Sequence, residues 1–430
     1  MLIGKRAYKV LKEISYERLG GTHEELSALE VLKREVETLG VETQIEEFEV
    51  NAYEIKNCEF VVTKPKKCVY KVNGFGMCGS TALAGVTTEF FYLESTKNIN
   101  KFEVSGKTVL LTSLMTYQVY EDLVKANVAA IVVSSGSIYD DERNTDLEEK
   151  MLRERHYKHG KVPCFTMRAK DCEKLVLSNP SEVNFKLVQE EKKVMSHNLV
   201  ATINGTEKSE EVVCFTAHYD SVRFSTGAYD NGTGSVTILE LLHYFVQNKP
   251  KRTLKFVWCG SEEMGLLGSH AYVEKHKEEL ENYKLCINVD MTGVVLGKDI
   301  AVCTSEMSFV NYIDYFAKNI GFVIETSQGV YSSDSTPFAY HGVPAVSFAR
   351  ISSRGGAEIH SRKDVIKTID PSYLEKTIVF ISKIAKELVN SVYFPIPKTM
   401  PQNMKDELDK YLGNKKNVYL IHLSGFVALF

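Results

Sequence analysis

Five side chains of the kinds that bind metal ions lie in loops that follow predicted strands. His218 follows the apolar run VVCFTA, Asp230 lies in the loop GAYDNGTG, Glu263 follows KFVWCG, Asp290 follows LCINV, and His360 lies in the late loop RGGAEIHSRKD. Two imidazoles and three carboxylates suit zinc or a similar borderline divalent ion. They are too many for one tetrahedral zinc that keeps a position for water, and they suit two ions.

The five ligands divide naturally between two metal ions. A two-metal site holds its ions about 3.5–4 Å apart and needs a carboxylate able to bridge them. We predict that Asp230 is this bridge, that His218 and Asp290 bind one ion, and that Glu263 and His360 bind the other. The expected cofactors are therefore two divalent metal ions, with Zn²⁺ the expected metal.

Three further carboxylates are predicted to act without binding metal. Glu262, beside one of the ligands, is the expected general base, which takes a proton from the metal-bridging water and delivers it to the leaving amine. Asp220, two residues after His218, can accept the second ring N–H of that histidine and fix its tautomer. Asp364 could support His360 in the same way.

Each motif taken alone is weak evidence for a metal site, but the five ligands taken together are specific. A single H-x-D pair is more often structural than metal-binding, because histidine and aspartate have many other uses. Two adjacent glutamates at the start of a helix are favoured electrostatically without any chemistry. Five ligands in this order, at predicted strand ends or in the loops after them, are hard to obtain by chance.

Strands and helices alternate over the second half of the chain, and this alternation would bring the ligands together. The strand candidates are residues 199–203, 212–217, 254–259, 285–289, 301–304, 321–325 and 345–348, and the helix candidates are 235–247, 266–277, 308–318 and 372–388. Such a pattern favours an α/β fold with a mostly parallel mixed sheet flanked by helices. In an open parallel sheet, ligands bind at the carboxyl ends of the strands.

The first half of the chain has a different pattern of apolar and polar residues. Thr22 and Glu25 form a capping-box pattern that opens a helix, which ends near Gly40. Short apolar runs follow at 60–63, 69–72, 109–112 and 129–133, with a helical stretch at 118–125 between the last two. They predict a smaller, β-rich α/β unit. The charged stretch 137–161 is predicted to be a solvated helix or a mobile excursion without chemistry of its own.

Composition excludes several classes of protein. The 430 residues include 52 Lys and Arg and 56 Asp and Glu, for a net charge of −4. Without a long basic run, neither nucleic acid nor an anionic membrane is an expected partner. No stretch approaches the roughly 20 apolar residues that span a bilayer. The N-terminus mixes charged and apolar residues, unlike a secretory signal, which predicts a cytoplasmic chain.

Nine cysteines, an odd and scattered set without C-x-x-C, indicate neither a disulfide framework nor a cysteine zinc site. Most are expected to be buried thiols.

The motifs AHYDS, AYDNGTGSV, GSEEMGLLGS, NVDMTG, SSDSTPF with GVPAVSF, and IHSRKD resemble those of the co-catalytic zinc aminopeptidase family. This group contains bacterial leucyl aminopeptidases and relatives of glutamate carboxypeptidase, and the resemblance covers about residues 196–390. It implies a zinc exopeptidase fold in which the metal and base roles fall on the residues assigned above. Residues 50–188 resemble, more weakly, the protease-associated domain that is often inserted ahead of the zinc ligands.

The resemblance implies four segments. Residues 1–50 would be the N-terminal helical part of the peptidase domain, 51–190 a protease-associated-like lid domain, 191–395 the zinc peptidase domain, and 396–430 a C-terminal extension. The extension lies beyond the resemblance. A terminal element docked on the surface is its simplest interpretation, and a partner-binding tail is the alternative.

The chain departs from the family pattern at two places. Family members commonly have SDH where residues 333–335 read SDS, and some have a tyrosine where this chain has Ile359. A phenol that polarises the scissile carbonyl would then come from elsewhere, for example Tyr331 or Tyr340.

These features predict a metal-dependent exopeptidase that removes N-terminal residues from peptides, with the lid excluding internal segments of long chains. A carboxypeptidase or dipeptidase on the same site is one alternative, and it would read a free carboxylate through Arg350 or Arg354, which are otherwise surface charges. A glutaminyl cyclase-like transferase uses one zinc, and the intact Asp230 argues against it. A catalytically inactive binding protein would typically have lost ligands, and this chain has lost none.

Overall fold

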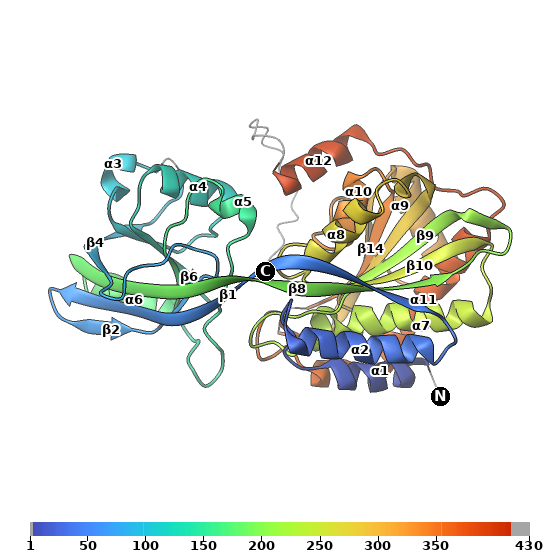
Figure 1. The fold of residues 1–430 in the computed structure, drawn as a ribbon, viewed down its shortest axis with the longest axis horizontal. Helices are drawn as coiled ribbons and strands as arrows, with labels where there is room; N and C mark the ends of the chain where they lie inside the picture. The colour runs from blue at the N-terminus through green and yellow to red at the C-terminus, as the bar shows by residue number, and fades with distance from the viewer. Residues whose placement is uncertain (1–2, 98, 354, 414–430) are drawn as a thin grey trace.

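A computed structural model describes residues 3–97, 99–353 and 355–413 of the chain. Two long antiparallel strands, β1 (Thr43–Lys64) and β8 (Glu182–Ile203), run through both lobes of the molecule (Figure 1). Because β8 pairs with β10 in one lobe and with β4 in the other, a single sheet of 14 strands passes through both lobes.

The larger lobe contains the predicted α/β architecture. Its strands are, in sheet order, β13 (Glu325–Gln328), β12 (Gly297–Thr304), β14 (Ala345–Ser352), β11 (Tyr283–Val289), β9 (Lys208–His218), β10 (Arg252–Cys259) and β8. The central four, β14, β11, β9 and β10, are parallel, and β12 and β8 flank them in antiparallel orientation. The prediction of a mostly parallel mixed sheet is therefore confirmed.

Helices cover both faces of this sheet (Figure 1). One face carries α1 (Ile3–Ile14), α2 (His23–Glu37), α7 (Thr233–Gln247), α9 (Met307–Asn319) and α11 (Pro371–Asn390), and the other carries α8 (Leu267–Lys275), α10 (Ser335–Tyr340) and α12 (Gln402–Leu412). Short helical turns lie at Ala228–Gly232, Leu280–Asn282 and Ile366–Thr368. The central helix α7 is buried on nearly every side, as its apolar sequence predicted.

The smaller lobe has its own core. Its strands are β2 (Cys68–Tyr70), β3 (Val72–Gly74), β4 (Val86–Leu93), β5 (Thr108–Leu111), β6 (Ala130–Ser135) and β7 (Cys164–Arg168), and its helices are α3 (Lys101–Val104), α4 (Tyr117–Lys125), α5 (Glu154–Tyr157) and α6 (Ala169–Leu177). Strands β4 to β7 are parallel, and the rings of Phe60, Phe165 and Phe185 pack edge to face between them and the long strands.

One predicted strand was wrong. Residues 321–324 precede the short edge strand β13 instead of forming it. Gly321 adopts a left-handed backbone (φ +70°) after α9, and Phe322 turns inward to stack on Phe380 with 4.0 Å between ring centroids. Phe322 and Ile324 therefore pack on the helical face, Val323 is exposed, and the segment does not join the ladder.

Two further features were not visible in the sequence. The expected segment limits at 50/51 and 190/191 fall within β1 and β8, because each of these strands continues without interruption from one lobe to the other. The charged stretch 137–161 is mostly loop and contains only the short helix α5. Among the described helices, none combines the length and apolar character that crossing a membrane requires.

Candidate metal centre

The first group of metal-ligand side chains comes from the ends of central strands. His218 is the last residue of β9, Asp290 directly follows β11, and Asp230 lies in the turn before α7. The His218 Nε2 atom is 3.2 Å from Asp230 Oδ1 and 3.7 Å from Asp290 Oδ1. All three side chains are buried, and their ligand atoms lie close enough together to hold one ion.

The second group shares Asp230 with the first. The His360 Nε2 atom is 3.2 Å from Asp230 Oδ2 and 3.1 Å from Glu263 Oε2. These three residues also form a set that can hold an ion. One oxygen of Asp230 thus faces each group, which is the arrangement that a carboxylate bridging two ions requires. The structure brings together all five side chains that the sequence singled out.

The charges of the centre fit bound cations. Asp290 Oδ1 and Glu263 Oε1 are buried and have no hydrogen-bond donor among the described residues, and a buried carboxylate oxygen without a partner is unfavourable. Burial disfavours a charged His218, yet the carboxylates of Glu262, Asp220 and others around the ring raise its pKa well above the usual value. The cluster of carboxylates that favours a charged ring here would also attract a divalent cation.

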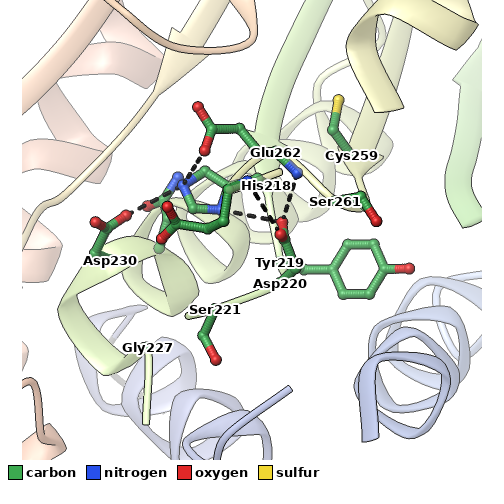
Figure 2. Close-up of polar contacts among 12 residues, drawn as sticks. His218, Tyr219, Asp220, Ser221, Gly227, Asp230, Cys259, Ser261 and Glu262 are labelled. Atoms are coloured by element: carbon green, nitrogen blue, oxygen red, sulfur yellow. Dashed lines mark hydrogen bonds and ion pairs between the residues drawn. The ribbon is translucent and has the colours of Figure 1, made fainter. Parts of the chain in front are cut away.

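Asp220 positions two parts of the centre at once (Figure 2). One carboxylate oxygen lies 3.4 Å from His218 Nδ1 and also accepts the backbone N–H of Glu262 at 3.0 Å. The other accepts the backbone N–H of Glu263 at 3.2 Å. This single buried carboxylate therefore ties the orientation of a candidate ligand to the turn that carries the candidate base.

Glu262 lies beside the first group without belonging to it. Its Oε2 atom is 3.9 Å from His218 Nε2, and its side chain is buried. Burial raises the pKa of Glu262, His218 opposes that shift, and nearby carboxylates, Glu263 first among them, add to it. A carboxyl group whose pKa is raised holds a proton more strongly, which suits a general base.

Asp364 differs from its predicted place. We expected it to support His360, but its carboxylate accepts the backbone N–H groups of Tyr229 at 2.7 Å and Asp230 at 3.1 Å. It also accepts the Ser225 hydroxyl at 3.3 Å. Asp364 therefore positions the shared carboxylate, a role that sequence spacing could not show because the contact joins two loops distant in the chain.

Three residues at the centre adopt left-handed backbone conformations. Ser261, Met291 and His360 have φ values of +53°, +58° and +53°, and each is a candidate ligand or stands beside a candidate ligand or base. Such conformations are unfavourable for residues other than glycine and cluster at functional sites. They turn the side chains of the strand ends toward one place.

Only one of the two expected phenols lies near the centre. Burial, followed by the charges of Asp290, Asp230 and Glu262, raises the pKa of Tyr331, so this phenol lies within electrostatic range of both ligand groups. Tyr340 is exposed, and its ring packs against His341 at the end of α10.

One of the two predicted carboxylate-reading arginines, Arg350, is engaged within the protein and is not available for substrate. Arg350 is buried, donates to Asp299 Oδ2 at 2.6 Å, and also donates to the carbonyls of Val294 and Val295. Arg354 lies outside the described residues.

Two residues near the N-terminus support the site and were not predicted. Glu25, on α2, accepts the backbone N–H of Ser261 at 3.1 Å and the hydroxyl of Ser196 at 2.7 Å. Arg18 is fully buried and donates to the carbonyls of the loops on either side of Ser221, including Gly227 at 2.7 Å. The capping box at Glu25 was visible in the sequence, but its long-range partners were not.

Comparisons with known proteins agree with this geometry. Residues 198–385 match the model of Peptidase family M28. Leucine aminopeptidase 1 of Trichophyton equinum is 31% identical over 239 residues, which cover 49% of this chain and 63% of that protein. Aminopeptidase YwaD of Bacillus subtilis is 32% identical over 218 residues, 46% of this chain and 45% of that protein. The chain thus spans less than two thirds of the length of these curated relatives, and the resemblance indicated by the motifs is confirmed.

Solved structures share the fold over nearly the whole chain. An aminopeptidase from Aneurinibacillus sp. strain AM-1 matches with a TM-score of 0.74 and 19% identity, covering 92% of this chain and 96% of that one. BSAP, a zinc aminopeptidase from Bacillus subtilis, matches with a TM-score of 0.75 and 21% identity, covering 93% and 98%. The smaller lobe is therefore included in the shared fold.

Proposed function

We propose that this protein is a metal-dependent aminopeptidase that removes N-terminal residues from peptides. The observation that carries this proposal is the pair of ligand groups that share Asp230, with the buried Glu262 beside them. Relatives named leucine aminopeptidase support the choice of the N-terminal bond.

The ligand set favours two zinc ions. His218 and Asp290 would hold one, Glu263 and His360 the other, and Asp230 both. Mixed imidazole and carboxylate ligands are typical of catalytic zinc, and one solved structure of this fold is a zinc aminopeptidase. Two bound cations would supply Lewis-acid polarisation of the scissile carbonyl and a water that is easily deprotonated.

The protein's own residues supply the proton transfers and the orientation. Glu262 takes the proton of the attacking water and delivers it to the leaving amine, since its buried carboxyl can hold a proton between the two steps. Asp220 keeps His218 and the Glu262 turn in fixed relation. We assign the phenol of Tyr331 to the carbonyl side of the reacting bond, where its hydroxyl can donate to the developing oxyanion.

The smaller lobe is proposed to be a protease-associated-like lid over residues 51–190. It packs its own core around β4 to β7, and its loop Ser137–Lys161 reaches the larger lobe. A wall at this place would block internal segments of long chains and leave room for chain ends. The larger lobe, 191–395 with residues 1–50, would be the peptidase domain, and α12 lies in the remaining segment 396–430.

We propose a cytoplasmic location. All nine cysteines are free thiols, eight of them at least partly buried, which fits a reducing compartment. Peptides are the proposed partners, and no nucleic-acid or membrane partner is proposed.

Matched peptides with blocked ends test the function. The zinc-loaded protein is given a short peptide with its N-terminus free or acetylated and its C-terminus free or amidated, and the released residue is identified by mass spectrometry. Acetylation should abolish cleavage, and amidation should leave N-terminal release in place. If only amidation abolishes cleavage, the protein is a carboxypeptidase. If no form of the peptide is cleaved, a cyclase or a binding protein is favoured.

The same assay tests the role of Glu262. The Glu262→Gln variant should retain its metal and lose about 10²–10⁴-fold in kcat, the usual contribution of a general base. Asp314→Asn, on an exposed helix face, serves as the control with unchanged activity. Full activity of Glu262→Gln would refute the assignment.

A further inference from the structure

The charged stretch Ser137–Lys161 of the smaller lobe lies against the metal centre instead of facing only solvent. Asp146 accepts two hydrogen bonds from Arg362, at 2.5 and 2.7 Å, two residues beyond the ligand His360. Glu149 accepts from Arg223 at 2.7 Å. The helix α5, within this stretch, faces the end of α12 (Figure 1). The stretch therefore forms the edge of the lobe that borders the site.

Arg153, at the start of α5, reaches the turn that carries the proposed base. A Cβ atom at Gly265 would lie 3.3 Å from the Cδ atom of Arg153 and 3.6 Å from its Nε atom, so the side chain rests directly on this glycine. The backbone N–H of Gly265 donates to the carbonyl of Glu262 at 2.8 Å. The guanidinium of Arg153 is thus held over the turn of Glu262, away from the lobe to which it belongs.

The surroundings of Arg153 are aromatic and acidic. Burial disfavours its charge, but Tyr117, Tyr411 and Glu262 face the guanidinium and raise its pKa, so it stays a cation. Tyr117 belongs to α4 and Tyr411 to α12, so three elements enclose this position. The wall is fixed by Arg155, which donates to the Tyr411 carbonyl at 2.7 Å and stacks on the Tyr117 ring at 4.1 Å.

Arg153 forms no ion pair with a carboxylate among the described residues. Arg18 forms none either, but its N–H groups donate to backbone carbonyls. Each of three other arginines forms an ion pair in which its nitrogen lies 2.7 Å or less from a carboxylate oxygen: Arg223, Arg350 and Arg362. Within the described part of the chain, no carboxylate lies within ion-pair distance of the partly buried Arg153 guanidinium. The Tyr117 hydroxyl hydrogen-bonds to Arg153 but carries no compensating charge. A partly buried cation without a counter-ion is unfavourable, and a guanidinium offers paired N–H donors whose geometry matches a carboxylate.

The position beside Glu262 indicates which part of a substrate would meet Arg153. Under the proposed function, Glu262 delivers a proton to the leaving amine, so the residue on the leaving side of the bond lies near the Glu262 turn. In a dipeptide, the free carboxylate is attached to the carbon that bears the leaving nitrogen. In a longer peptide, only an acidic side chain of the second residue could place a carboxylate there.

We propose that Arg153 is a specificity-determining residue that binds a carboxylate on the leaving-side residue, which makes dipeptides or peptides with an acidic second residue the preferred substrates. This inference rests on the proposed aminopeptidase function. It also explains why the smaller lobe takes part in the site: the lobe contributes the charge that selects the substrate, in addition to limiting access.

Three substrates with the same scissile bond test this inference. Leu-Ala, Leu-Ala-amide and Leu-Asp-amide differ only in whether the second residue carries a carboxylate and where. The wild type should cleave at least one carboxylate-bearing substrate with a kcat/KM about 10- to 100-fold above Leu-Ala-amide, the range expected for a charge-assisted hydrogen bond. Preference for Leu-Ala identifies the terminal carboxylate as the source, and preference for Leu-Asp-amide identifies the side chain.

The variant Arg153→Gln should remove this preference and leave Leu-Ala-amide cleavage within about threefold of wild type. Arg153→Lys, which keeps the charge but loses the paired donors, should be intermediate. Arg143→Gln is the matched control, because Arg143 lies in the same charged stretch with its side chain 93% exposed. Melting temperatures report whether the variants fold.

Binding separates failure of this inference from failure of the proposed function. In the Glu262→Gln background, calorimetry should show that Leu-Ala or Leu-Asp-amide binds more tightly than Leu-Ala-amide and that Arg153→Gln abolishes the difference, whether or not any peptide is cleaved. The inference would be overturned if Arg153→Gln lowered kcat/KM equally for all three substrates. It would also be overturned if the wild type showed no preference for a substrate that carries a carboxylate. Cleavage of none by the wild type, with selective binding intact, would overturn only the function.

Discussion

The two halves of the proposed metal centre are built by different parts of the fold. His218 and Asp290 are fixed at the ends of β9 and β11, in the middle of the parallel sheet, and both are buried. Glu263 and His360 lie in loops, and the His360 side chain is 44% exposed. Asp230 belongs to both. The sheet therefore defines one half before any ion binds, while the other half depends on loop conformation.

The supports of the two halves differ in the same way. His218 is backed by Asp220, a buried carboxylate that also holds the turn of Glu262. His360 has no comparable buried support in the described structure, and its loop is tied by Arg362 to Asp146 of the smaller lobe. Preorganised ligands bind metal more tightly. We therefore expect the sheet half to bind its ion more tightly than the loop half.

Removing the shared carboxylate should erase the difference between the halves. Asp230→Asn takes a charged ligand from both groups at once and should lose both ions, with kcat falling at least about a thousandfold, since metal polarisation contributes several kcal/mol to the transition state. Metal analysis by inductively coupled plasma mass spectrometry measures the loss. A variant that keeps two ions and its activity would show that Asp230 does not bridge.

Removing one histidine from each half should show the asymmetry directly. His360→Ala should retain about one zinc per chain, and His218→Ala should lose the tightly bound ion and release zinc more readily in dialysis. The reason is that His218 is 1% exposed and fixed by the sheet, whereas His360 belongs to a loop. If His218→Ala retained more zinc than His360→Ala, the loop half would be the tighter of the two.

The contact between Asp220 and His218 can be weakened without replacing a metal ligand. Asp220→Asn keeps the size of the side chain but weakens the contact to His218 Nδ1 and should reduce affinity for the tighter ion by about 10- to 100-fold, the usual effect of a group that orients a ligand. Affinity for the weaker ion should change less. Competition with a zinc chelator measures both, and an equal change in the two would contradict the separate support of the sheet half.

The tie between the loop half and the smaller lobe should have a smaller effect. Arg362→Gln removes a partly exposed ion pair with Asp146 and should lower affinity for the weaker ion about two- to fivefold, as expected for a surface ion pair. The effect should disappear at high salt, because exposed charges are screened. Arg143→Gln is again the control. A salt-independent effect would indicate a packing role for Arg362.

An ion pair outside the centre gives the smallest expected effect. The Nε2 atom of His276 lies 2.9 Å from Glu46 Oε1, and its Nδ1 atom lies 3.0 Å from Glu279 Oε1. These contacts, that with Glu46 first, raise the pKa of His276, and burial opposes the shift. This contribution to stability is present below pH 6.5 and is lost as pH rises through the raised pKa. His276→Gln should therefore destabilise by about 1 kcal/mol at pH 5.5 and less at pH 9. Urea unfolding at the two pH values measures this, and equal losses would contradict it.

The sheet half of the centre was also the half that sequence could place most fully. His218 and Asp290 follow apolar runs that read as buried strands, so their positions follow from the rule for parallel sheets. The second half was assigned from residue types, and the structure brings those residues together. Roles that depend on contacts between distant loops, such as that of Asp364, were not accessible to spacing.

Long-range contacts also explain the other differences. Glu25 and Arg18 act on the centre across more than 200 residues of sequence, and no local pattern marks such partners. The charged stretch around Arg153 had the composition of a solvated loop, and only the path of β1 and β8 places it beside the centre. The strand expected at 321–325 was misplaced because apolar residues there pack on a helix.

Calorimetric titration of the metal-free protein with zinc tests the central claim most directly. The account predicts two ions per chain with separate affinities, the tighter of which is weakened by Asp220→Asn and the weaker by His360→Ala. A single bound ion, or two ions of equal affinity that respond alike to both substitutions, would contradict a centre built half by the sheet and half by loops.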